Sequence, residues 1–309
     1  MDNYRTFVVT DRNVSAYARK LYPDRPVLEI EASESTKTME TVMGIARWLL
    51  GEGADRESML VAVGGGCTTD ICGFVASIYM RGMHYASHPT TLLSMVDASI
   101  GGKAGVNLDG FKNMLGSFKS PYFIKPVYDA LEDLPDREFR SGVVEMLKTF
   151  LIGDARAYEE AVDLFSRIPR PSIGLLKPLI ADAANIKFSI VEKDAYEKDL
   201  RRTLNLGHTV GHAIEWWQAR DASRPQFSHG EAVAIGIIEA ARKSEELSLA
   251  RRGLAEKLAS DFSSCLIPTL LPCPLEDLSP AIRADKKSKD GKVHWVLICK
   301  PGKVVIRAI

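Results

Sequence analysis

Short apolar runs alternate with helical stretches through the first part of the chain. Runs rich in β-branched residues predict four strands, over residues 5–11, 25–32, 58–66 and 84–90. Apolar residues at helical spacing predict two helices between them, over residues 36–53 and 68–80. Strands and helices that alternate in this order are typical of a parallel sheet with helices on both faces.

From about Leu134 the pattern changes, and strand signals almost disappear. Helical periodicity predicts four further helices, over residues 136–153, 171–194, 208–220 and 229–247. Strand character returns over residues 294–309, around a Pro-Gly turn. A chain of 309 residues is long for one core. We therefore expect an α/β domain over residues 1–132, followed by a mostly α-helical domain over residues 133–309.

Composition narrows the class of protein. Forty basic side chains balance 40 acidic ones, so the chain has no overall field that would attract nucleic acid or an anionic membrane. No apolar run approaches the roughly 18–20 residues of a membrane-spanning helix, and no secretory leader is visible. The five cysteines lack C-x-x-C spacing, so neither a disulfide framework nor a thiolate metal site is indicated. We expect a cytoplasmic enzyme that acts on a small molecule.

Three glycines, Gly64 to Gly66, join a predicted strand to a predicted helix that has Asp70 in its first turn. Glycine allows a backbone to approach a phosphate closely, and a helix N-terminus adds N–H donors. The spacing is not that of the G-x-G-x-x-G fingerprint, and a plain tight turn is the alternative.

Residues 89–113 combine hydroxyls, glycines and charges within a short span. The residues that carry these features are Thr90, Thr91, Asp97, Gly101, Gly102, Lys103, Lys112 and Asn113. Paired glycines beside lysines are typical of a phosphate clamp. A solvated loop with incidental lysines would explain the lysines but not the adjacent glycine pair, which favours a binding function.

Two of the six histidines, His208 and His212, are spaced to share one face of a helix. His229 begins the next predicted helix, and Glu145 interrupts an apolar helix face, where an unpaired charge would be costly. Lys148 follows Glu145 by one turn. Histidines and a carboxylate from neighbouring helices are typical of a metal centre. For any one histidine alone, a core residue or a helix cap is the alternative.

Taken together, these residues resemble the 3-dehydroquinate synthase family. The resemblance extends over nearly the whole chain, and its motifs occur in family order: GGGCTTDICGF, YMRG, PTTLLSMVDASIGGK, the Lys112-Asn113 pair, VVEMLK, LNLGHTVGHAIE and HGEAV. It implies an NAD-binding α/β domain followed by a helical metal-binding domain, and a homodimer.

The resemblance also implies roles for individual residues. Those that would contact NAD are Asp11, Asn13, Glu34, Lys37, Gly65, Gly66, Asp70, Thr90, Thr91 and Lys112. The ligands of Zn²⁺ or Co²⁺ would be Glu145, His208 and His229. The residues that would act on the substrate are Arg81, Asp97, Lys103, Asn113, Lys148, Lys187, Arg201, Asn205, His212 and Lys286. Among these, Lys187 and Arg201 would take a carboxylate, and Arg81 would reach a phosphate across the dimer.

The reaction implied by the family starts from 3-deoxy-D-arabino-heptulosonate 7-phosphate, a phosphorylated seven-carbon sugar acid. NAD oxidises a secondary alcohol, phosphate leaves by β-elimination, NADH returns the hydride, and an aldol step closes the carbocycle to 3-dehydroquinate. NAD is regenerated, so the cofactor carries the redox chemistry and the protein orients it. The product belongs to the shikimate pathway of aromatic amino acid biosynthesis. There are three alternatives to this function: a related cyclase that acts on a carboxylate-free sugar phosphate, a polyol dehydrogenase, and a non-catalytic homologue that binds a nucleotide.

Three features depart from the family pattern. The segment before the E-S-T-K motif is short, and the segment between His212 and His229 is longer than usual. We expect the longer segment to form a surface loop. Thr149-Phe150 stands where an aromatic residue or histidine followed by glycine is common, which would change packing near Lys148.

Overall fold

The computed structural model describes residues 4–109, 111–284 and 293–309. The chain forms two compact units, Met1–Leu134 and Pro135–Ile309.

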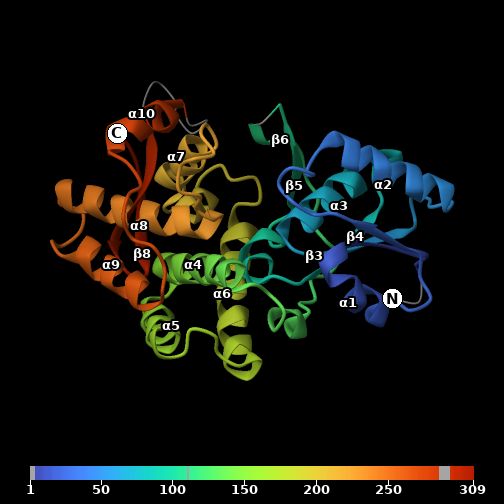
Figure 1. Cartoon of the computed structure of the whole chain (residues 1–309), viewed down its shortest axis with the longest axis horizontal. Helices are drawn as coiled ribbons and strands as arrows, with labels where there is room; N and C mark the ends of the chain where they lie inside the picture. Colours follow the sequence, from blue (N-terminus) through green and yellow to red (C-terminus); the bar gives the residue numbers. More distant parts are fainter. Residues whose placement is uncertain (1–3, 110, 285–292) are drawn as a thin grey trace. The chain divides into compact units, whose positions relative to one another are not determined.

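The first unit is built on a four-stranded parallel sheet, as the alternating pattern predicts (Figure 1). Its strands are β1 (Thr6–Asp11), β2 (Val27–Ile30), β3 (Met59–Gly64) and β4 (His84–Pro89), in the order β2-β1-β3-β4. Its α-helices are α1 (Ser15–Leu21), α2 (Met39–Gly51) and α3 (Gly66–Ile78). Short helical turns complete it: η1 (Arg12–Val14), η2 (Tyr79–Arg81), η3 (Ser94–Ala98) and η4 (Tyr128–Leu131).

Both faces of this sheet are covered by helices. Phe7 and Val9 of β1 belong to the core that α2 and α3 close, whereas Val8 packs with Ala18 of α1 on the opposite face. Successive side chains of a strand point to opposite faces, so β1 contributes to both cores. Every residue of β3 is buried, which is typical of a central parallel strand and explains why its sequence is continuously apolar.

The segment over residues 89–113 is more structured than a solvated loop. It contains the short π-helical turn η3, and then an antiparallel hairpin of β5 (Lys103–Leu108) and β6 (Phe111–Phe118). Most of β6 is exposed, so it lacks the apolar alternation that would have revealed a strand. The next helix also differs from expectation: α3 begins at Gly66, two residues earlier than predicted, so Asp70 lies just beyond its first turn.

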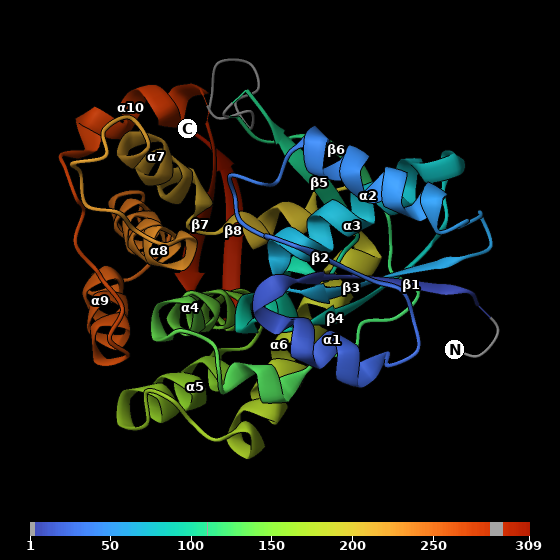
Figure 2. The ribbon, with the colours of Figure 1, turned by 45° about the vertical axis from the view of Figure 1, so that its right-hand side comes forward.

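The second unit is mostly helical, as predicted. Its helices are α4 (Asp136–Gly153), α5 (Ala155–Arg167), α6 (Ile173–Lys193), η5 (Leu200–Asn205), α7 (His208–Gln218), α8 (His229–Glu246), α9 (Leu254–Ser264) and α10 (Leu275–Ala284). The sequence pattern missed α5, α9 and α10. The predicted C-terminal hairpin is present as β7 (His294–Lys300) and β8 (Lys303–Ala308), with Gly302 at a φ of 77° in its turn. Figure 2 shows the hairpin beside α4 and α8, with which it is in contact.

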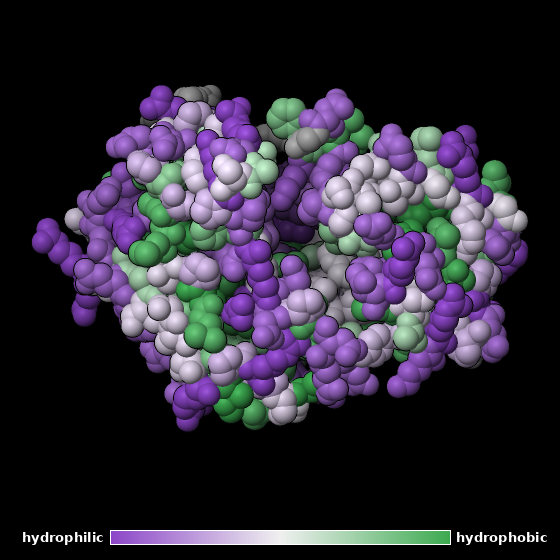
Figure 3. Space-filling model, viewed as in Figure 1, coloured by the Kyte–Doolittle hydropathy of each residue, from purple (hydrophilic) through white to green (hydrophobic). Residues whose placement is uncertain are grey.

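The long segment between α7 and α8 is an irregular, mostly exposed loop, as expected. On the face drawn in Figure 3, hydrophilic and hydrophobic residues are interspersed. Among the described residues, no helix is both long and apolar enough to cross a membrane.

Candidate metal centre and active-site residues

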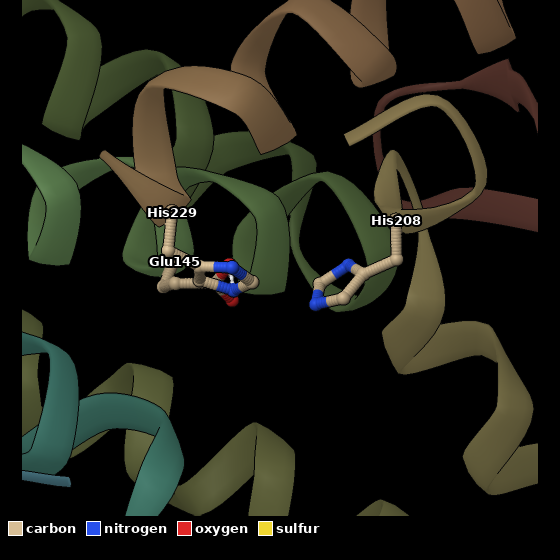
Figure 4. Close-up of side chains that lie close together, drawn as sticks. All are labelled: Glu145, His208 and His229. Carbon is tan, nitrogen blue, oxygen red and sulfur yellow. Dashed lines mark ion pairs between the residues drawn. The ribbon is translucent and has the colours of Figure 1, made fainter. Parts of the chain in front are cut away.

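Three helices of the second unit bring a carboxylate and two imidazoles to one point. Glu145 lies in the middle of α4, His208 is the first residue of α7, and His229 is the first residue of α8. One ligand atom of each lies within 4.8 Å of the others, and the side chains converge in Figure 4. Two nitrogens and one carboxylate oxygen are the donor set of many catalytic zinc sites.

The approach of α7 to α8 depends on glycine. A methyl carbon placed on Gly236 of α8 would lie 1.9 Å from the carbonyl oxygen of Gly207. Gly207 itself, which precedes His208, has a φ of 80°, a conformation that side chains of L-residues rarely adopt. The two backbones therefore touch at the point where the His208 helix begins.

A second close approach joins α8 to α4. A methyl carbon on Gly230 would lie 2.5 Å from the Cα atom of Ser141, and the Gly230 N–H donates to Oγ of Ser141 at 2.9 Å. Ser141 precedes Glu145 by one helical turn, and Gly230 directly follows His229. This contact therefore brings His229 next to Glu145.

Glu145 is fully buried, and its surroundings fit a cation. Nε2 of His229 lies 3.6 Å from Oε1, and Nζ of Lys148 forms an ion pair with Oε2. Neither carboxylate oxygen receives a well-directed hydrogen bond from the described residues. The ion pair with Lys148 offsets part of the cost of burying this carboxylate, and a metal ion beside Oε1 would offset more of it. The residues present therefore fit a divalent metal.

The two imidazoles are oriented through their Nδ1 atoms. Nδ1 of His208 lies 3.2 Å from the carbonyl oxygen of Leu206, and Nδ1 of His229 lies 3.3 Å from Oε1 of Glu215. Burial lowers the pKa of His229, but the carboxylates of Glu215 and Glu145 outweigh burial and raise this pKa above the usual value for histidine. Glu215 was missed in the sequence, although its position two helical turns after His208 was a signal.

His212 lies beside the cluster of Glu145, His208 and His229 but is not part of it. Its ring centroid is 5.2 Å from that of His208 and 6.3 Å from that of His229, and its side chain is exposed. The i, i+4 spacing therefore places both histidines of α7 on one face, while only His208 converges with Glu145 and His229.

Other predicted substrate residues of this unit are buried cations. Lys148, Lys187 and Arg201 are buried, and they lie on α4, α6 and η5, which pack against one another. Lys148 is paired with Glu145, and positive charge gathered in a buried region is compatible with an anionic ligand. Asn205, also on η5, donates from Nδ2 to Oε1 of Glu197 at 2.6 Å. Glu197 was not singled out in the sequence.

In the first unit, several predicted NAD residues form a polar cluster. Nζ of Lys37 donates to Oδ2 of Asp70 at 2.5 Å and to Oδ1 of Asn113 at 2.6 Å. Glu34 accepts a hydrogen bond from Asn107 at 3.1 Å. Burial disfavours the charged form of Lys37, but Asp70 and Glu34 outweigh it and raise the pKa of Lys37. Asn113, expected at the substrate phosphate, thus lies with the residues expected at NAD.

The carboxyl ends of the parallel strands carry further predicted NAD residues. Oδ1 of Asp11, the last residue of β1, accepts the backbone N–H of Asn13 at 3.0 Å. Gly65 and Gly66 follow β3, and Thr90 and Thr91 follow β4, with the N–H of Thr90 donating to Gly64 at 3.0 Å. Ligands of open parallel sheets bind at this edge.

The remaining predicted residues are spread over the first unit. Asp97 lies in η3, Lys103 in β5 and Lys112 in β6. Arg81 has a φ of 69° and follows Met80 at 48°, so two strained residues precede Gly82. Lys286 lies outside the described residues.

We expect the substitution Lys37→Met to change stability at alkaline pH. Folding raises the pKa of Lys37, so the charged ammonium stabilises the folded state. This stabilisation is fully present below the pKa of an unfolded lysine, about 10.4, and it is lost as the pH rises through the pKa of Lys37 in the folded protein. Urea unfolding from about pH 9 to about pH 12 should therefore show a shrinking difference in unfolding free energy between wild type and variant. A difference that stays constant over this range would contradict the prediction.

Two family models together match most of the chain. The family model described as 3-dehydroquinate synthase N-terminal matches residues 27–141, and the C-terminal model matches residues 142–288. A 3-dehydroquinate synthase of Acidithiobacillus ferrooxidans is 40% identical in an alignment 308 positions long, which covers 97% of this chain and 84% of the relative.

Two solved structures resemble the whole chain. A 2-deoxy-scyllo-inosose synthase complexed with carbaglucose-6-phosphate, NAD⁺ and Co²⁺ has a TM-score of 0.88 and 26% identity, with 100% of this chain and 88% of that chain covered. A 2-epi-5-epi-valiolone synthase from Streptomyces hygroscopicus, with NAD⁺ and Zn²⁺ bound, has the same TM-score and coverage at 28% identity. Because both family models match in chain order and a relative is 40% identical over 97% of this chain, the chain belongs to the 3-dehydroquinate synthase family.

Proposed function

We propose that the protein is a metal- and NAD-dependent 3-dehydroquinate synthase, a lyase that converts 3-deoxy-D-arabino-heptulosonate 7-phosphate into 3-dehydroquinate and phosphate. The observation that carries the proposal is the convergence of Glu145, His208 and His229, in a chain of this family, on a point beside the buried Lys148. The product would feed the shikimate pathway.

Both cofactors belong to the proposal. The two cyclases with the same fold were solved with NAD⁺ and either Co²⁺ or Zn²⁺. Zn²⁺ or Co²⁺ would be held by the three ligands named above, and NAD by the carboxyl edge of the sheet with Lys37 and Asp70. When bound, the metal supplies Lewis acidity to a substrate hydroxyl and NAD supplies a reversible hydride acceptor.

The side chains of the second unit supply orientation and proton transfer in this proposal. Lys148 places an ammonium beside the carboxylate of Glu145, where it donates to a hydroxyl of the substrate. Lys187 and Arg201 offer buried positive charge to the substrate carboxylate. The exposed His212 exchanges a proton with a substrate oxygen near the centre. Fixed donors of this kind lower the barrier because they need no reorganisation during the reaction.

Residues of the first unit would complete the substrate set. Asp97 would contact a ring hydroxyl, and Lys103 and Asn113 would hold the phosphate together with Asn205. Arg81 is exposed, and in the homodimer that we propose it would reach the phosphate bound by the partner subunit. The five free cysteines fit a reducing compartment, and we place the enzyme in the cytoplasm.

A related sugar-phosphate cyclase acting on a carboxylate-free substrate is the second candidate. It is favoured by the similarity of the fold to the two cyclases, at 26% and 28% identity. The 3-dehydroquinate synthase of Acidithiobacillus ferrooxidans is more similar in sequence, at 40% identity. Buried Lys187 and Arg201 also suit a substrate that carries a carboxylate, so we prefer the first candidate.

The test is release of inorganic phosphate from 3-deoxy-D-arabino-heptulosonate 7-phosphate, with the absorbance of NADH followed in the same sample. We expect release that requires both a divalent metal and a catalytic amount of NAD, without accumulation of NADH, because the hydride is returned in each turnover. Accumulating NADH would indicate a dehydrogenase. No release from folded, metal-loaded protein, together with release from carboxylate-free sugar phosphates, would establish the second candidate instead.

A further inference from the structure

Glu215 is a carboxylate beside the metal centre that the proposed reaction does not use. It lies on α7, two helical turns after His208, and its side chain is only 11% exposed. Its Oε1 atom is 3.3 Å from Nδ1 of His229, the first residue of α8. The contact therefore connects the helix that carries one histidine ligand to the other histidine ligand.

The geometry assigns different tasks to the two nitrogens of His229. Nδ1 faces Glu215, while Nε2 lies 3.6 Å from Oε1 of Glu145 and so faces the centre. When Nδ1–H donates to a carboxylate, the proton is held on Nδ1, and Nε2 keeps the lone pair that binds a metal. Glu215 thus selects the tautomer and the ring orientation that a metal requires.

The two histidines of the centre are not equivalent in this respect. The Nδ1 atom of His208 faces a neutral acceptor, the carbonyl oxygen of Leu206, at 3.2 Å. A carboxylate partner makes an imidazole more basic than a carbonyl partner does, and it adds negative charge near the cation. Removal of the Glu215 charge is therefore expected to weaken the centre through His229.

We propose that Glu215 is a positioning residue that sets the affinity of the centre for its divalent metal by holding the imidazole of His229. The inference rests on the proposed function, because it takes the three converging residues as ligands of a resident metal. Glu215 acts through His229 and contacts neither the substrate nor NAD in this reading.

The experiment is a metal titration with Zn²⁺ against a chromophoric chelator, made on wild type, Glu215→Gln and Glu215→Ala. Loss of such a partner weakens metal binding by about 10- to 100-fold, and we expect Glu215→Ala to fall in this range. Glu215→Gln keeps an oxygen that accepts Nδ1–H but loses the charge, so it should show a smaller loss. The Co²⁺ absorption spectrum should shift in Glu215→Ala, because the coordination geometry changes.

Glu246→Gln is the matched control. Glu246 ends α8, its side chain is 63% exposed, and it pairs with Lys243, so this variant removes the same charge far from the centre. It should bind Zn²⁺ as wild type does. The circular dichroism spectra and unfolding midpoints of the metal-free variants should match those of metal-free wild type. If Glu215→Ala fails to fold, the isosteric Glu215→Gln still shows the effect of removing the charge on Zn²⁺ affinity.

Failure of the role of Glu215 and failure of the proposed function give different results. If wild type binds one Zn²⁺ and releases phosphate, while both Glu215 variants bind Zn²⁺ within about twofold of wild type, the role of Glu215 is wrong and the proposed function stands. If wild type itself binds no stoichiometric metal, or binds it and processes no sugar phosphate, the proposed function fails, whatever the Glu215 variants do.

Discussion

Replacing His208 by alanine should abolish metal binding at micromolar concentrations of Zn²⁺ and lower phosphate release by more than about 100-fold. The lower bound follows from the loss seen when only a partner of a ligand is removed, since a missing ligand costs more. Glu145 and His229 alone leave two donors, too few for a stable catalytic site. The measurement is phosphate release at saturating NAD with a parallel metal titration.

A thermal scan adds a readout that does not depend on substrate. A ligand that binds only the folded state stabilises it, so Zn²⁺ should raise the melting temperature of wild type and leave that of His208→Ala unchanged. His84→Ala is the control, because His84 lies in β4 of the other unit and takes no part in the cluster. Metal-dependent activity that persists in His208→Ala would remove His208 from the set of ligands.

Replacing Gly236 by alanine should destabilise the second unit more than any surface substitution. The added methyl carbon would lie 1.9 Å from the carbonyl oxygen of Gly207. A backbone atom cannot rotate out of the way as the end of a side chain can. Overpacking of this severity costs about 3 kcal/mol or more, which corresponds to a fall in melting temperature of roughly 6 °C or more for a unit of this size. The loss should be measured by thermal and urea unfolding.

Gly44→Ala is the matched control for this prediction. Gly44 lies inside α2, and an added methyl carbon would meet nothing within 4 Å. Alanine there should stabilise the chain by about 0.5–1 kcal/mol, because it lowers the backbone entropy of the unfolded state. If both substitutions had the same sign, the close approach of α7 and α8 would not be the reason for the glycine at position 236.

Gly236→Ala should also affect the metal site. The contact of Gly236 with Gly207 is next to His208, and α8 begins with His229. A separation of the two helices would pull the two imidazoles apart. Zn²⁺ affinity should therefore fall in Gly236→Ala protein that still folds, although the substitution touches no ligand.

Local patterns in the chain predicted the candidate centre well. The spacing of His208 and His212 places both on one face of α7, and a charged residue in the apolar stretch of α4 pointed to Glu145. The strands β1, β3 and β4 and the helix α3 were also visible, because continuous apolar runs and helical periodicity are local properties. The hairpin β5–β6 was not visible, since its exposed strand has no apolar face.

Tertiary structure decided which of these residues meet. The pairing of Glu215 with His229 crosses from α7 to α8, and that of Asn113 with Lys37 joins a hairpin to the turn before α2. Such contacts depend on the distance between two backbones. The spacing of residues along a single helix or strand does not determine that distance. The glycines before His208 and after His229 were visible in the sequence, but only the packed helices show why they are glycines.

By itself, then, the sequence determined the elements, the family and the set of candidate ligands, because these follow from periodicity and from motifs. Only the folded chain decided that Glu145, His208 and His229 converge, that Nδ1 of His229 faces a carboxylate, and that His212 lies beside the centre. The physical reason is steric: side chains from separate helices meet only where backbone contacts such as that of Gly236 with Gly207 allow it.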